Sequence, residues 1–245
     1  DVQPEFAAIH ELRSDLPVEC VTLTAPSFCG PHWGMVLPEG APLDPVTDYA
    51  YHRRVLQVLQ HQASHERAGA TPNWLLKTPA HLAMLPLVFQ TYPDAWIVQT
   101  HRDPARTMPS TVSTTAMVRW IRSDHVDIRS LAASIDAAFG GILNSVAEQR
   151  DAGAFPARFV DVHFQDLMTD PVAAVRAAYA GMGRNMSDAH AERIQRYLAE
   201  KPRGKFGVHR YRAEEWGFDP VDLRKRLRPY IDPVSYTHLT LPTIL

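Results

Sequence analysis

A basic side chain and a hydroxyl flank a predicted strand-to-helix junction in the middle of the sequence. An apolar run at 96–98 leads into Arg102, and Ser110 follows eight positions later. Asp103 and Pro104 are residue types favoured at the N-cap and first position of a helix. A guanidinium, a hydroxyl and a helix N-terminus can together hold a phosphate group. The spacing therefore predicts a phosphate site at Arg102 and Ser110.

The same residues also allow a structural interpretation. Arg102 could form an ion pair with Asp103 or with Asp94. The Ser110 hydroxyl could hydrogen-bond to the backbone within its own helix, as serine often does. Spacing alone does not separate these alternatives from phosphate binding.

The elements around the junction predict an α/β fold. Short apolar runs at 74–78, 95–100 and 157–164 predict three buried strands. Apolar residues at helical spacing predict helices near 51–59, 82–90, from 105 onward, and at 131–146, 172–179 and 194–198. Strands that alternate with helices pair in parallel, and such sheets bind ligands at the carboxyl ends of their strands.

Composition sets the class of protein. The chain has 245 residues, 45% of them hydrophobic, and a formal net charge of −2, which argues against general electrostatic binding to nucleic acid. Cys20 and Cys29 form no CxxC pair, the histidines show no metal-ligand spacing, and no run approaches the ~18 apolar residues of a membrane span. We expect a cytoplasmic protein without a metal or a membrane span.

Four stretches carry a resemblance to a known family: LPVEC, WLLKTPAHLAMLPLVFQTYPDAWIVQTHRDPARTMPS, FVDVHFQDLMTDPVAAVRAAY and HRYRAEEWGFDP. They resemble the bacterial sulfotransferases that use 3′-phosphoadenosine 5′-phosphosulfate (PAPS). The resemblance implies a three-layer parallel sheet flanked by helices, related to the P-loop nucleotide kinases. It also implies that Arg102 and Ser110 bind the 3′-phosphate of PAPS.

The family's second phosphate grip is a loop near the amino terminus. No glycine-rich turn with the required hydroxyls and basic residue precedes Gly30 in this sequence. We therefore expect an N-terminally truncated domain that lacks the first strand and the loop for the 5′-phosphosulfate, and that does not turn over by itself.

Sulfonate transfer needs a base for the acceptor hydroxyl and a cation near the leaving phosphate. The resemblance places these roles in LLKTPAHL, on Lys77 and His81. In sulfotransferases of the cytosolic type the comparable segment is Lys-Thr-His-Leu, so Pro79 and Ala80 are an insertion before the histidine here. Histidine suits a base because its reference pKa is about 6.5. The alternative for His81 is a helix-capping or partly buried structural histidine.

A basic loop near the carboxyl end of related sulfotransferases closes on the 3′-phosphate and adenine. Its matching candidates here are Arg203, Gly204 and Lys205, in KPRGKFGVHRY. The alternative is a solvated turn, since charged runs are usually solvated.

The last twelve residues are set apart from the domain. Residues 234–243, VSYTHLTLPT, match a one-frame translation of a transposase-end sequencing adaptor. We therefore expect a sulfotransferase domain at 1–233 and a non-native tail at 234–245. The alternative is a genuine tail that forms a last short strand.

Together these features predict a PAPS-dependent sulfotransferase that acts on an acceptor hydroxyl of a sugar, a lipid, a phenol or a tyrosine. A small-molecule or nucleoside kinase of the same fold superfamily is one alternative, although the sequence shows no Walker lysine. A non-catalytic nucleotide-binding module is the other, and it would not require Lys77 or His81.

Overall fold

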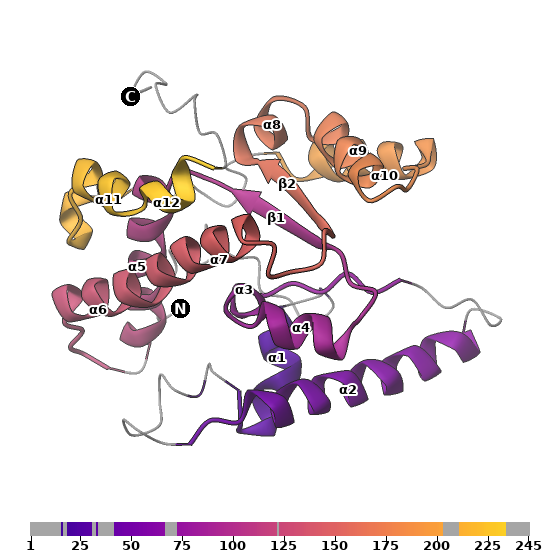
Figure 1. Ribbon diagram of the computed structural model, residues 1–245, viewed down its shortest axis with the longest axis horizontal. Coiled ribbons are helices and arrows are strands. Elements are labelled where there is room, and N and C mark those ends of the chain that lie inside the picture. Colours follow the sequence, from indigo (N-terminus) through magenta and orange to yellow (C-terminus); the bar gives the residue numbers. More distant parts are fainter. Residues whose placement is uncertain are drawn as a thin grey trace. The chain divides into compact units, whose positions relative to one another are not determined.

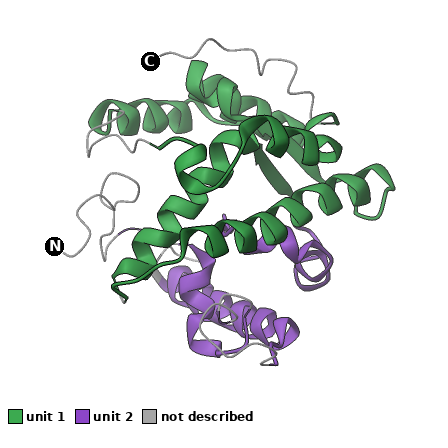
Figure 2. Ribbon diagram, turned by 90° about the vertical axis from the view of Figure 1, so that its left-hand side faces the viewer, with its two compact units in different colours: residues 1–13, 96–245 green, residues 14–95 purple. Residues whose placement is uncertain are grey.

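The computed structural model describes residues 16, 19–30, 33, 42–66, 73–121, 123–202 and 211–233. These residues belong to two compact units that meet in sequence between Ala95 and Trp96 (Figure 2). Unit 2 holds the described residues up to Ala95, and unit 1 holds those from Trp96 onward. The predicted boundary between residues 233 and 234 lies at the edge of the described region, and the tail at 234–245 lies outside it.

The described regular structure of unit 2 is helical (Figure 1). Its elements are α1 (Cys20–Thr24), η2 (Ala25–Ser27), α2 (Pro45–Glu66), α3 (Ala80–Ala83) and α4 (Leu85–Thr91). The long helix α2 begins where the Asp44 carboxylate accepts hydrogen bonds from the backbone N–H groups of Val46 and Thr47, both at 3.1 Å. Its inner face buries Tyr49, His52 and Leu56, which lie one turn apart.

The strand predicted at 74–78 is wrong. Residues 73–78 have no regular secondary structure, and Leu75 is 92% exposed. Among the described residues, its backbone bonds to other elements are one from Cys20 N to Lys77 O at 2.8 Å and one from His81 N to Thr78 O at 3.3 Å, and neither is part of a strand ladder. An apolar run becomes a strand only where a neighbour pairs with it, and no described residue does so here.

Unit 1 holds a parallel pair of strands, β1 (Ile97–His101) and β2 (Phe159–His163), paired from Ile97 opposite Phe159 to His101 opposite His163. The described residues thus contain a two-stranded sheet in place of the three predicted strands. The helices of this unit are α5 (Pro104–Trp120), α6 (Ile128–Ile135), η4 (Asp136–Gly140), α7 (Gly141–Asp151), α8 (Phe164–Thr169), α9 (Pro171–Gly181), α10 (Asp188–Glu200), η5 (Glu214–Trp216), α11 (Pro220–Arg226) and α12 (Arg228–Ile231).

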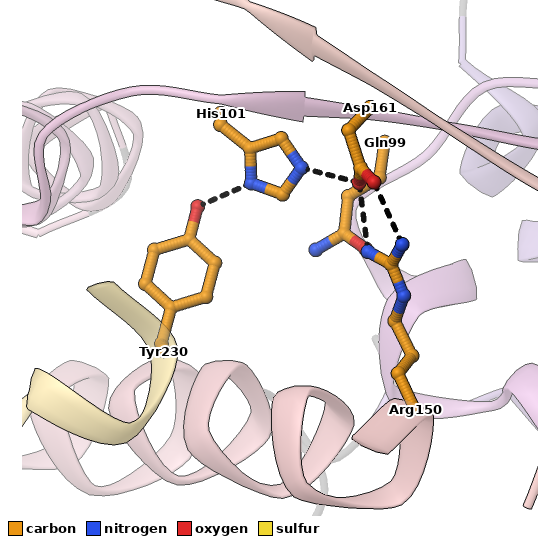
Figure 3. A network of polar contacts seen from close by, with 5 residues as sticks. All are labelled: Gln99, His101, Arg150, Asp161 and Tyr230. Carbon is orange, nitrogen blue, oxygen red and sulfur yellow. Dashed lines mark hydrogen bonds and ion pairs between the residues drawn. The ribbon is translucent and has the colours of Figure 1, made fainter. Parts of the chain in front are cut away.

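One face of this sheet is polar. Side chains alternate along a strand, so Gln99 and His101 of β1 lie on the same face as their partners Asp161 and His163 of β2. The Asp161 carboxylate accepts two hydrogen bonds from Arg150, at 2.7 and 2.8 Å, and one from His101 at 2.7 Å (Figure 3). The other nitrogen of His101 lies 3.0 Å from the Tyr230 hydroxyl, and Arg150 also donates to the Gln99 amide oxygen at 2.9 Å. The network therefore ties both strands to α7 and α12.

The helical segments α6, η4 and α7 follow one another without a break. By length and composition alone, the segment at 128–151 could cross a membrane. This was not predicted from the sequence, because the sequence shows no continuous apolar run of that length. Its residues Leu131, Ile135 and Val146 are buried, and its Asp136 forms an ion pair with Arg226 at 2.6 Å. We therefore interpret it as a core helix of unit 1.

The core of unit 1 is built where α5, α6 and α11 meet. Val112 and Leu223 are fully buried there, and Leu131 and Leu227 are almost so. Each fully buried aliphatic side chain stabilises a fold by about 1.5–3 kcal/mol. This packing fixes α5, which begins directly after the carboxyl end of β1.

Candidate active site

The predicted phosphate site lies where β1 passes into α5. Asp103 is the N-cap of α5, since its side chain accepts from Ala105 N at 2.9 Å, and Pro104 takes the first helical position. This part of the sequence prediction is confirmed. Arg102 precedes the cap, is exposed, and places its guanidinium 4.3 Å from the centre of the Phe164 ring.

The structural alternatives for these residues are not realised. Asp103 pairs with Arg224 of α11, with the closer nitrogen–oxygen distance at 2.5 Å, and Arg102 forms no ion pair with any described residue. Thr111 and Thr114 donate to backbone carbonyls one turn back, but the Ser110 hydroxyl donates to no described residue. Within the described part of the chain, the Arg102 guanidinium thus has no ion-pair partner and the Ser110 hydroxyl has no hydrogen-bond acceptor.

The carboxyl-terminal region reaches the same helix end. The Tyr211 hydroxyl donates to the Arg106 carbonyl oxygen in the first turn of α5 at 2.8 Å. The predicted loop residues Arg203, Gly204 and Lys205 lie outside the described residues, eight to six positions before this anchor. Their proposed role stays a prediction.

Lys77 and His81 both belong to unit 2 but have different surroundings. Lys77 is 68% exposed and forms an ion pair with Glu19. His81, on α3, lies with its Nδ1 2.7 Å from the Tyr49 hydroxyl of α2, and its Nε2 is buried without a hydrogen-bond partner among the described residues. The structure places Lys77 at the surface and His81 against α2.

The surroundings of His81 keep its imidazole neutral. Burial, followed by repulsion from His52, lowers the pKa of His81 to about 4. Burial raises the pKa of the Tyr49 hydroxyl above its usual range, so this group stays protonated near neutral pH. A neutral imidazole has one unprotonated ring nitrogen, and His81 can therefore accept a proton.

His52 is a second buried histidine in this region, and the sequence interpretation missed it. Its Nδ1 lies 2.7 Å from the Tyr92 hydroxyl, and its ring centre lies 5.9 Å from that of His81. His52 and His81 line one cavity of about 20 Å³. His52 lies in the helix predicted near 51–59, which was the available signal, but its partner Tyr92 comes from a distant position in the chain.

A larger cavity lies in unit 1 beside the network of Figure 3. It measures about 390 Å³ and is lined by Gln99, Arg150, Asp161, His163 and Tyr230, among others. Burial alone would raise the pKa of Asp161, but hydrogen bonds from Arg150 and His101 outweigh it and hold that pKa well below its usual range. No group of three or more histidine, cysteine or acidic residues that could hold a metal occurs in the described part of the chain.

Relatives of known structure share this fold. The crystal structure of sulfotransferase STF9 from Mycobacterium avium matches with a TM-score of 0.75 and 23% identity, over 91% of this chain and 57% of that one. Sulfotransferase STF1 from Mycobacterium tuberculosis H37Rv matches with a TM-score of 0.68 and 24% identity, over 89% of this chain and 56% of that one. At this identity the likeness shows the fold, which is α/β as predicted.

Sequence comparison gives the family. Two curated relatives, from Mycobacterium bovis (strain ATCC BAA-935 / AF2122/97) and Mycobacterium tuberculosis (strain CDC 1551 / Oshkosh), are each called omega-hydroxy-beta-dihydromenaquinone-9 sulfotransferase Stf3. Each is 23% identical over 142 residues, which cover 58% of this chain and 36% of the relative. The chain thus spans only about a third of the length of these relatives. Residues 2–188 match the model of the sulfotransferase family, and the chain belongs to that family.

Proposed function

We propose that the chain supplies nucleotide-binding and catalytic residues of an enzyme that transfers the sulfonate group of PAPS to an acceptor hydroxyl. The acceptor oxygen forms a bond to sulfur while the bond from sulfur to the bridging phosphate oxygen breaks. The electron pair of that bond leaves with adenosine 3′,5′-bisphosphate, and the hydroxyl proton passes to Nε2 of His81. Because the pKa of His81 is lowered to about 4, the proton moves as the hydroxyl becomes acidic during bond formation.

The observation that carries the proposal concerns Arg102 and Ser110, on either side of the first turns of α5, whose polar groups have no ion-pair or hydrogen-bond partner among the described residues. The positive end of the α5 dipole favours an anion, and Arg102 adds a charge without an ion-pair partner among the described residues. Ser110 adds a hydroxyl about 9 Å along the helix that donates to no described residue. These groups match a phosphate monoester, which is what the 3′-phosphate of PAPS offers. Arg203, Gly204 and Lys205 would complete this side of the nucleotide.

Lys77 is the proposed cation for the leaving phosphate. Its present partner, Glu19, is an exchangeable surface partner, because exposed ion pairs are worth only about 0–1 kcal/mol. An arriving anion can therefore take over the ammonium group. We propose an acceptor on a hydroxylated lipid, since the relatives Stf3 are named for a hydroxylated menaquinone derivative.

Nucleotide binding tests the proposal directly. We expect adenosine 3′,5′-bisphosphate to raise the melting temperature of the chain more than adenosine 5′-phosphate or Mg-ATP at equal concentration. Arg102→Ala should weaken binding of the bisphosphate by about 2 kcal/mol, the size of a charged hydrogen bond, and leave adenosine 5′-phosphate nearly unchanged.

Arg119→Ala is the matched control, because Arg119 is an exposed arginine at the other end of the same helix. It should bind both nucleotides as the parent chain does. Equal losses for both nucleotides in Arg102→Ala would mean that this arginine only supports the fold. A preference for Mg-ATP would favour the kinase alternative.

A further inference from the structure

His52 and His81 form a matched pair in unit 2. Each imidazole has its Nδ1 2.7 Å from a tyrosine hydroxyl, Tyr92 for His52 and Tyr49 for His81. Each leaves a buried Nε2 without a hydrogen-bond partner among the described residues. His52 is only 1% exposed. Buried polar atoms are nearly always satisfied, so two such nitrogens, on rings whose centres lie 5.9 Å apart, indicate a bound group.

The cavity that both residues line limits what this group can be. Its volume of about 20 Å³ is enough for one water molecule or one hydroxyl. The cavity is partly open to solvent, and most of its wall area is apolar, with Cys20, Val21 and Met84 among the lining residues. Asp48, Thr24 and Thr78 also line it. A ligand must therefore bring a single small polar group on a slender apolar stem.

The protonation states of His52 and His81 favour a hydroxyl as the polar group of the ligand. Burial lowers the pKa of both histidines, with repulsion between the two rings as a further cause for His81, so both rings are neutral near pH 7. A neutral imidazole whose Nδ1 is bonded to tyrosine presents at Nε2 either a lone pair or an N–H group. A hydroxyl can donate to one Nε2 and accept from the other, whereas an ether can only accept.

We propose that His52 is a positioning residue for the acceptor, and that the pair takes a primary alcohol at the end of an aliphatic chain. Tyr92 donates to Nδ1 of His52, whose Nε2–H then donates to the acceptor oxygen. Nδ1–H of His81 donates to Tyr49, so that its Nε2 accepts the hydroxyl proton. The small volume of the cavity favours a hydroxyl on the end of a chain over one on a ring. The role in catalysis rests on the proposed function, but alcohol binding needs no nucleotide.

Histidine side-chain ¹⁵N spectra of the chain, without nucleotide, test this directly. We use 1-hexanol as the probe, cyclohexanol as a ring alcohol of equal carbon number, and methyl pentyl ether as a chain of equal length that cannot donate. We expect 1-hexanol to shift the Nε2 signals of both His52 and His81 in a saturable manner, and the other two compounds to shift neither at the same concentration.

Variants separate positioning from support of the fold. His52→Phe should raise the Kd for 1-hexanol about tenfold or more, the effect of one buried hydrogen bond, and His52→Gln should restore much of the binding because its amide can donate. His61→Phe, on the exposed end of the same helix, is the matched control and should leave the Kd unchanged.

Equal shifts from cyclohexanol or the ether, or no shift from 1-hexanol, would overturn the proposal and leave the cavity to water. Unchanged 1-hexanol binding in His52→Phe would show that His52 does not position the alcohol. Failure of adenosine 3′,5′-bisphosphate to bind would instead count against the proposed function, with the alcohol site unaffected.

Discussion

Arg150 holds together the polar face of the sheet in unit 1. Its guanidinium forks onto the two oxygens of Asp161, donates to Gln99 and lies 4.5 Å from the centre of the Phe159 ring. A lysine has the same charge but a single ammonium group, so it cannot make the parallel pair of bonds or stack on a ring in the same way. The shape of the side chain matters here as well as its charge.

We expect Arg150→Lys to lower the free energy of unfolding by about 1–3 kcal/mol, the range for losing hydrogen bonds to a charged group. Urea denaturation measures this change. Arg176→Lys is the control, because Arg176 makes one 3.2 Å ion pair with Asp188, whose side chain is 93% exposed, and one bond to the Met186 carbonyl oxygen at 3.1 Å. It has no forked pair to lose, so the stability should change by less than about 1 kcal/mol. Equal effects of the two substitutions would contradict a special role of Arg150.

Helix starts and long helices were predictable from sequence because their signals are local. Asp103 and Pro104 lie next to the helix that they begin, and the apolar stripe of the helix at 128–151 repeats every three to four residues. The run at 74–78 has the composition of a strand but lacks a pairing partner among the described residues. Strand formation depends on that distant partner, which composition does not reveal.

The candidate site divides in the same way. Arg102 and Ser110 could be identified as candidate phosphate ligands from one short stretch of sequence around a helix start. His52 could not, because the Tyr92 hydroxyl that holds it lies forty positions further along the chain. Pairings of this kind follow from how α2, α3 and α4 pack, and only the tertiary structure shows them.

At the scale of elements, Asp103 links the start of α5 to α11. It caps the helix and forms the ion pair with Arg224. Asp103→Ala removes both interactions, whereas Asp103→Asn keeps a capping oxygen and removes the charge. We expect both substitutions to destabilise unit 1, and Asp103→Ala to cost about 1 kcal/mol more, the usual value of an N-cap.

Asp127→Ala provides the comparison for this prediction. Asp127 caps α6 by accepting from Ser130 N at 3.0 Å. Its loss should cost about 1 kcal/mol, the value of a cap alone. Thermal unfolding of the three variants measures the order. If Asp103→Ala cost no more than Asp127→Ala, the ion pair to Arg224 would contribute nothing to stability.

At the scale of the whole molecule, the stability of the fold depends on how pH acts on its buried groups. His52 and His81 have lowered pKa values in the folded protein, and Asp161 does as well. The histidines titrate in the unfolded chain near their ordinary pKa of about 6.5, whereas unfolded aspartate titrates near 3.9. The histidines therefore govern stability at mildly acidic pH, and the carboxylate governs it only at lower pH.

We expect the free energy of unfolding to be greatest above pH 6.5 and to fall as the pH is lowered toward about 4, the pKa of His81 in the folded protein. In this interval the unfolded chain binds more protons than the folded one, so acid favours unfolding. At about 1.4 kcal/mol per pKa unit, His81 alone accounts for a loss of about 3 kcal/mol by pH 4, and His52 adds to the loss in the same direction. Hydrogen exchange should detect the loss first in the amides of α2, because His52 belongs to that helix and His81 contacts it.

The variant His52→Gln/His81→Gln should flatten the dependence of the unfolding free energy on pH between pH 6.5 and 4, whereas His61→Gln should preserve it. A pH slope that survives in the double variant would show that other groups cause the acid sensitivity.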